Sequence, residues 1–241
     1  MSAALTILLV NGNSTEALTR KLAASARGFY RPDYTVIAAT PRDGPGYISS
    51  RVEATIAAHR ILEAVTTAAK EFAPGHFDAC VVACFGEPGI GAVRERHSFP
   101  VVGMAEASVL SALQSGDRFA IVTVGKGWRG MLEEWLRQTG LERRCCGIFA
   151  LAGQALDLAA KREAALGQLR SAVAEAVERG GADVVIIGGA ALAGFAAALQ
   201  PEFEVPLIDS LTAALAQAEA LARLSPVATR RRVAEPPPEE R

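Results

Sequence analysis

Long apolar runs, clusters of metal-binding residues and an excess of one charge are all missing from this 241-residue chain. No apolar segment approaches the roughly 20 residues that a helix needs to cross a bilayer. A formal net charge of −1 gives no indication of nucleic acid or an anionic membrane surface as a partner. The three histidines stand far apart, with no cysteine or carboxylate at ligand spacing, so we expect no metal.

Cysteine is also scarce, and its spacing argues against disulfides. Of the four cysteines, Cys145 and Cys146 are adjacent in sequence, and adjacent cysteines rarely bridge. This usage fits a reducing compartment best, and we expect a cytoplasmic protein. The apolar opening at 5–10 follows no basic stretch and is too short for a signal sequence, so it predicts a first strand.

Half of the residues are apolar, which allows a sizeable core, and they recur in short runs between helical segments. After the first strand, Asn13 and Glu16 have the spacing of a capping box for a helix that runs to about Phe29. A single long helix is predicted from about Asp157 to Arg179. Alternating strands and helices favour an α/β fold with parallel sheets. The strands are expected at about 5–10, 34–39, 78–84, 101–102, 119–124, 146–150, 183–188 and 205–209.

The second half of the chain repeats the first. Asp78 precedes Cys84 by six residues, as Asp183 precedes Gly189. A proline that opens a short apolar strand follows Cys84 after 16 residues and Gly189 after 17. We therefore expect two similar, pseudo-symmetric lobes, each a mostly parallel sheet flanked by helices, with the active site in the cleft between them. The predicted division is 1–100 plus 208–228 for the first lobe, 101–207 for the second and 229–241 for a mobile tail.

Cys84 is the candidate around which a site is expected. It lies at the carboxyl end of a buried strand, and Pro88-Gly89 should open a helix soon after it. Ligands bind at such strand ends in open α/β sheets, and a helix N-terminus lowers the pKa of a nearby thiol. Cys84 is thus predicted to be a reactive thiolate, whereas Cys80, inside the strand, is interpreted as a buried hydrophobe. The Pro/Gly-rich loop 41–46 is suited to cover the site as a lid.

These motifs together resemble the Asp/Glu/hydantoin racemase superfamily, and within it the hydantoin racemase branch. Residues 11–14 are similar to the family's Asn-Pro-Asn-Ser/Thr, with Gly12 in place of the proline. Residues 83–89 are similar to the branch's Ala-Cys-Phe-Gly-Asp-Pro-Gly, and 101–107 and 122–126 also match. The resemblance extends nearly to the tail.

The resemblance implies a cofactor-independent enzyme that acts on a small molecule, a hydantoin or a related amino-acid derivative, and by analogy a homo-oligomer. One family cysteine removes a proton from the stereocentre and a second cysteine, on the opposite face, returns one. Cys84 would be the first of these acid/base groups. Backbone N–H groups of the glycine turns, with Asn13 and Thr123, would hold the developing oxyanion. The expected substrate-binding residues are Asn13, Ser14, Phe85, Gly86, Thr123, Gly188, Gly189 and Ala190.

The chain departs from the family at the second cysteine. The family motif Gly-Cys-Ala-Gly is replaced here by residues 188–191, Gly-Gly-Ala-Ala, and Cys145 and Cys146 lie about 40 residues too early to substitute. One alternative is a racemase in which Glu106, Asp209, Lys126 or a water supplies the second proton. Others are a single-cysteine decarboxylase of the arylmalonate type, and a binding protein that retains the cleft without turnover.

Overall fold

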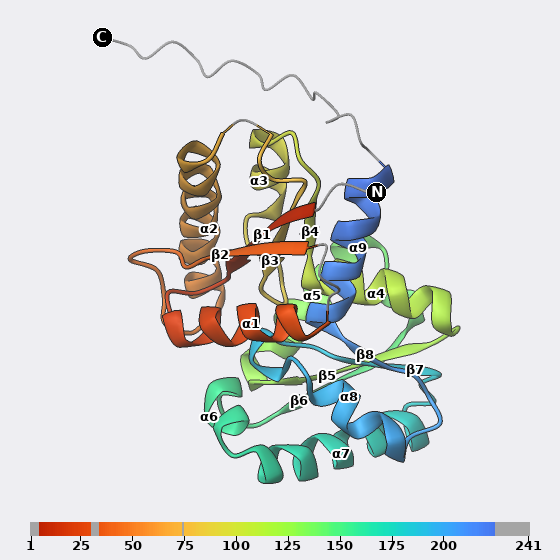
Figure 1. Ribbon diagram of the computed structural model, residues 1–241. Coiled ribbons are helices and arrows are strands. Elements are labelled where there is room, and N and C mark those ends of the chain that lie inside the picture. Colours follow the sequence, from red (N-terminus) through yellow and green to blue (C-terminus); the bar gives the residue numbers. More distant parts are fainter. Residues whose placement is uncertain (1–4, 30–33, 74, 225–241) are drawn as a thin grey trace.

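The computed structural model describes residues 5–29, 34–73 and 75–224 (Figure 1). They form two sheets of four parallel strands, each flanked by helices, which confirms the predicted α/β class with two lobes. The predicted tail at 229–241 lies outside these residues. The first sheet has the order β2-β1-β3-β4, from β1 (Leu5–Asn11), β2 (Tyr34–Ala39), β3 (Ala79–Ala83) and β4 (Val101–Gly103). The second has the order β6-β5-β7-β8, from β5 (Phe119–Val124), β6 (Cys145–Leu151), β7 (Val184–Ile187) and β8 (Leu207–Asp209).

The two strand orders are the same, so the internal repeat seen in the sequence is a repeat of architecture. β3 and β7 occupy equivalent positions, and every residue of both strands is buried. Continuous apolar runs of this kind are typical of parallel strands covered by helices on both faces. The segments after β3 and β7 therefore leave their sheets at equivalent ends.

The helices connect these strands and cover both faces of each sheet (Figure 1). α2 begins where the Ser50 side chain accepts a hydrogen bond from the Glu53 N–H, a standard N-cap. The helices are α1 (Glu16–Phe29), α2 (Arg51–Glu71), α3 (Ile90–Arg96), α4 (Met104–Ser115), α5 (Lys126–Thr139), α6 (Ala155–Ala160), α7 (Arg162–Glu178), α8 (Phe195–Leu199) and α9 (Ser210–Leu224), with 3₁₀ turns η1 (Glu142–Arg144), η2 (Ala190–Leu192) and η3 (Gln200–Glu202).

Two local predictions require correction. The helix expected over 157–179 is divided into α6 and α7 at Lys161, whose backbone has φ −110° and ψ 68°. After the break α7 packs on β5 and β6, whereas α6 packs against α7 and η2. Asn13 does not cap α1, which begins at Glu16. Its Oδ1 accepts the Thr15 N–H at 3.0 Å, which makes an Asx turn one step before the helix.

The predicted lobe boundaries also shift. β4 pairs with β3 in the first sheet, so residues 101–103 belong to the first lobe, and β8 pairs with β7 in the second. A proline directly precedes each of these two strands, as predicted. The chain crosses between lobes just afterwards: α4 packs against β7, α9 returns to β3, and the two helices pack on each other. No helix within the described ranges is long and apolar enough to cross a membrane.

Candidate active site

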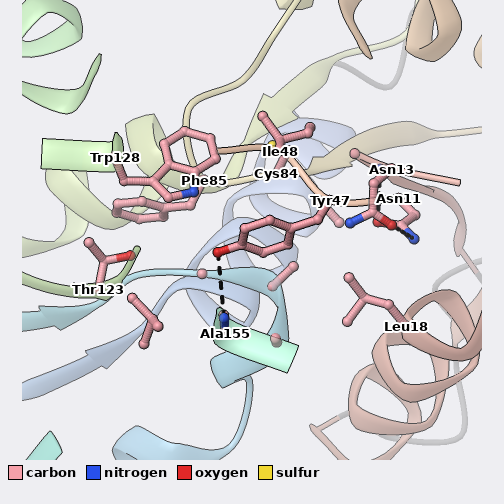
Figure 2. Close-up of a pocket in the computed structure, with 16 residues that line it drawn as sticks. Asn11, Asn13, Leu18, Tyr47, Ile48, Cys84, Phe85, Thr123, Trp128 and Ala155 are labelled. Carbon is pink, nitrogen blue, oxygen red and sulfur yellow. Dashed lines mark hydrogen bonds between the residues drawn. The ribbon is translucent and has the colours of Figure 1, made fainter. Parts of the chain in front are cut away.

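A cavity of about 60 Å³ lies between the two lobes, at the carboxyl ends of the strands (Figure 2). One water needs roughly 10–15 Å³ of such volume, so the cavity has room for several waters or for a small ligand. The first lobe contributes Asn11, Gly12, Asn13, Leu18, Tyr47, Ile48, Ala83, Cys84 and Phe85. The second contributes Thr123, Val124, Trp128, Ala155, Gly189, Ala190 and Ala191.

Cys84 follows β3 and forms part of the first-lobe wall. A Cβ atom added to Gly12 would lie 2.5 Å from Cys84 Cβ and 2.9 Å from its Sγ. Any larger residue at position 12 would therefore displace the thiol, which explains a glycine after β1. Only 6% of the Cys84 residue surface is exposed.

The environment of Cys84 favours the thiol over the thiolate. Burial raises its pKa to about 12, and the negative charge of Glu87 adds to the increase, while a backbone hydrogen bond from Glu87 opposes it. The thiolate predicted from a neighbouring helix N-terminus is not what this structure gives, because α3 starts only at Ile90. Cys80 is fully buried, which raises its pKa as expected for an inert core thiol.

Glu87 links the Cys84 turn to the start of α4. Its Oε1 accepts the Glu106 N–H at 2.6 Å, and a Cβ on Gly103 would lie 2.1 Å from the same oxygen. The carboxyl group therefore caps α4 from the turn that carries Cys84. Burial raises the pKa of Glu87 to about 7, although the hydrogen bond from Glu106 lowers it.

Six of the nine predicted site residues line the cavity, namely Cys84, Asn13, Phe85, Thr123, Gly189 and Ala190. Ser14, Gly86 and Gly188 do not. The Ser14 hydroxyl donates to the Gly44 carbonyl at 2.9 Å, and the Ser14 N–H donates to Pro45 O at 3.1 Å. Ser14 thus fastens the loop 41–46 next to the cavity, where a lid was expected.

The glycines at 86 and 188 make room for aromatic rings. A Cβ on Gly86, whose φ is +145°, would lie 2.4 Å from the Trp128 ring, and one on Gly188 would lie 2.5 Å from the Phe85 ring. Their N–H groups donate to Cys84 O and Val122 O, and that of Gly189 donates to Ser210 Oγ. These three amides are engaged within the protein, so they are not available to hold an oxyanion.

None of the three residues considered for the second proton lines the cavity. Glu106 pairs with Arg94. Asp209 caps α9, since its Oδ1 accepts the N–H groups of Leu211 and Thr212. Lys126 is exposed at the start of α5. The structure therefore gives each of them a role outside the cavity.

Tyr47 and Trp128 are the aromatic lining residues that the sequence did not assign to the site. Tyr47 follows the lid loop, and its Oη accepts the Ala155 N–H across the lobes at 3.4 Å (Figure 2). Burial raises the pKa of the Tyr47 hydroxyl, while the Ala155 N–H and the Trp128 side chain oppose that increase. The position of Tyr47 just after a Pro/Gly-rich loop is the signal that could have identified it.

The cavity lining holds no Asp, Glu, Lys, Arg or His side chain. Within the described part of the chain, no group of three His, Cys, Asp or Glu residues is arranged to hold a metal ion. Burying a charged ligand without a partner charge is costly. The lining therefore suits a neutral ligand, held by the polar groups of Asn13, Tyr47 and Thr123.

Comparison with known proteins gives consistent matches over almost the whole chain. The family model described as Asp/Glu/Hydantoin racemase matches residues 7–218. A hydantoin racemase from Paenarthrobacter aurescens is 36% identical over 218 residues, which cover 90% of this chain and 91% of the relative.

Solved structures agree with this match. An allantoin racemase from Klebsiella pneumoniae superimposes with a TM-score of 0.88 at 29% identity, covering 98% of this chain and 95% of that one. A double mutant of arylmalonate decarboxylase, with one glycine changed to cysteine and one cysteine to serine, has a TM-score of 0.67 at 16% identity, over 90% and 92% of the two chains. The latter likeness is one of fold.

Glu87→Gln is expected to lower the pKa of Cys84, because it removes a negative charge while keeping a carbonyl oxygen that can accept the Glu106 N–H. The measurement is the rate of Cys84 alkylation by iodoacetamide against pH, followed by mass spectrometry. At pH 8 the variant should react faster than the native protein. Glu95→Gln, on the exposed side of α3, is the matched control. Equal rates in all three proteins would contradict the coupling.

Glu87 should also make stability depend on pH. Its pKa in the folded protein, about 7, lies above the ordinary value of 4.5, so its contribution is fully present below 4.5 and is lost as pH rises through 7. The loss approaches roughly 3 kcal/mol. Urea unfolding at pH 5 and pH 8 should show a larger decrease in the native protein than in Glu87→Gln. Parallel decreases would refute this assignment.

Proposed function

Because the chain belongs to the Asp/Glu/hydantoin racemase family, we propose that it inverts the stereocentre of a neutral hydantoin with Cys84 as an acid/base. The observation that carries the proposal is a cysteine at the wall of a small cavity that no charged side chain lines. Relatives named hydantoin racemase and allantoin racemase support it. Such racemases need no cofactor.

The reaction requires a weak carbon acid to lose a proton. The C5–H bond of a hydantoin lies next to a carbonyl group, so removal of its proton gives an enolate in which the stereocentre is planar. Return of a proton to the opposite face inverts the configuration. A thiolate within reach of C5 is a suitable base, and a positioned acid/base of this kind contributes about 10²–10⁴-fold to the rate.

The uncharged lining favours hydantoins over free amino acids. A zwitterion or a carboxylate would leave water without gaining a partner charge, whereas a hydantoin ring presents only N–H and carbonyl groups. Asn13 Oδ1 already accepts from Asn11 and Thr15, which leaves the Asn13 amide N–H₂ group to donate to a ring carbonyl. Thr123 presents a hydroxyl from the second lobe.

The aromatic and aliphatic residues of the cavity wall limit the size of the substituent at C5 of the hydantoin. Leu18, Ile48 and Trp128 surround a cavity of about 60 Å³. We therefore propose substrates with short substituents, such as 5-methylhydantoin or allantoin, which is itself a hydantoin with a ureido group at C5. A 5-benzyl group would have to displace Trp128.

A single-cysteine decarboxylation is the second candidate, favoured by one specific feature. Cys84 stands alone with Gly189 in the second motif, and the two positions altered in the arylmalonate decarboxylase mutant are likewise one glycine and one cysteine before alteration. Loss of CO₂ generates the carbanion without a base, so a protonated thiol with a pKa of about 12 would be a sufficient donor. The uncharged lining counts against a malonate dianion.

Exchange at C5 tests the function directly. Enantiopure 5-methylhydantoin or allantoin in D₂O should lose its C5–H signal and its optical rotation faster with protein than without, and Cys84→Ser should abolish the enzymatic loss of optical rotation. Proton NMR follows exchange, and polarimetry follows inversion. A Cys80→Ser variant controls for thiol loss elsewhere. No exchange of any hydantoin, together with CO₂ release from an arylmalonate, would replace the racemase with the decarboxylase.

Trp128→Ala should widen substrate choice. Removing the indole enlarges the cavity, so the ratio of kcat/KM for 5-benzylhydantoin over 5-methylhydantoin should rise by at least about tenfold. Trp135→Ala on the same helix is the matched control, because Trp135 lies outside the cavity lining. An unchanged ratio in Trp128→Ala would show that this ring does not set the size limit.

A further inference from the structure

We propose that Tyr47 is the acid/base on the second face of the substrate, in a chain whose second family cysteine is replaced by Gly189. This inference rests on the proposed racemase function. It assigns the proton that Cys84 cannot deliver, because one group cannot serve both faces of a planar carbon without moving.

The cavity lining offers few candidates for this task. Of its sixteen residues, only Cys84 and Tyr47 have side chains that titrate. Thr123 Oγ1 would lie 3.9 Å from a Cβ at 189, but an aliphatic hydroxyl is a far weaker acid than a phenol. Ala190 and Ala191 have no acid or base to offer.

The two groups lie on different walls. Cys84 Sγ lies against Gly12, in the first turn of the first lobe. Tyr47 also comes from the first lobe, but its ring crosses the cavity and its hydroxyl ends against the second (Figure 2). There it accepts the Ala155 N–H, and a Cβ on Gly125 would lie 3.1 Å from Oη. A ligand between the lobes therefore has the thiol on one side and the phenol on the other.

The hydrogen bond of Tyr47 leaves its proton free to be transferred. Its hydrogen-bond partner, the backbone N–H of Ala155, can only donate. Tyr47 Oη must act as the acceptor, so its own O–H is directed elsewhere. The same donor would stabilise the tyrosinate that remains after the proton has left.

The proton balance of the step is as follows. Cys84 first gives its own proton to solvent. For the enantiomer whose C5–H faces Cys84, the thiolate sulfur then takes the C5 proton and the C–H electron pair passes into the enolate. Tyr47 O–H then gives its proton to the other face of C5, where the enolate pair forms the new C–H bond. Cys84 thiol and Tyr47 tyrosinate remain. The opposite enantiomer is converted by the reverse sequence, and exchange with solvent restores the starting state.

Tyr47→Phe tests the inference, with both enantiomers of 5-methylhydantoin followed separately in D₂O. Inversion should fall by about 100-fold or more for each enantiomer. The enantiomer whose C5–H faces Cys84 should still exchange, now with retention, because the thiol returns deuterium to the same face. The other enantiomer should stop exchanging. Cys84→Ser should give the mirror-image pattern.

Controls separate proton transfer from a merely structural contact. Ala155→Pro removes the N–H that binds Tyr47 at the first helical position of α6, where proline is tolerated, after a residue that is already extended. Because that N–H would stabilise the tyrosinate, its loss should slow exchange at the Tyr47 face by less than Tyr47→Phe does and leave exchange at the Cys84 face unchanged. Trp135→Ala, at a position outside the cavity lining, should leave both rates unchanged.

The outcomes are distinct. Face-selective loss in Tyr47→Phe supports the assignment. Native-like inversion in Tyr47→Phe, or an equal slowing of C5–H exchange for both enantiomers, would overturn it while leaving the racemase function intact. Absence of exchange by the native protein would overturn the proposed function, and this inference with it.

Discussion

Desolvation of the Cys84 thiol is the constraint on which the rest of the site depends. The thiol lies in a cavity without charged lining residues, and burial raises its pKa to about 12. In such surroundings every charge that forms must be transient and locally compensated. A neutral substrate and a neutral partner acid satisfy that condition, as do hydrogen-bond donors that stabilise a short-lived negative charge. A permanently charged ligand or base would not.

The fold connects this site to the contact between lobes. Glu87 in the Cys84 turn caps α4, and α4 crosses to pack on β7 and α9. From the other side, the Lys21 Nζ of α1 donates to the Ala191 carbonyl at 2.6 Å, beside Gly189. Tyr47 makes a third crossing to Ala155. The relative position of the two walls is thus determined by groups within a few residues of the cavity, so lobe closure and site geometry are coupled.

Much of the fold follows from the sequence because its signals are local. Runs such as that of β3 predict buried parallel strands, and the matched spacing after Cys84 and Gly189 predicts the repeat. The roles of the site residues were harder to predict from the sequence. In sequence, a glycine that makes room for a neighbouring ring looks the same as one that offers an N–H group. The roles of Gly86 and Gly188 could therefore be assigned only from the structure. Tyr47 sits in an aperiodic loop, and the break at Lys161 interrupts an otherwise uniform helical pattern.

The backbone at position 189 bears on which group serves the second face of the substrate. Space is available there, since a Cβ would meet its nearest neighbours only at 3.7 Å. The backbone, however, has a φ of +140°, which residues with side chains rarely adopt. A cysteine at 189 would therefore require the turn to change conformation as well as gain a thiol. The backbone at Gly189 is therefore poorly suited to a residue with a side chain. The proposed second acid/base, Tyr47, reaches the second-lobe side of the cavity from the first lobe.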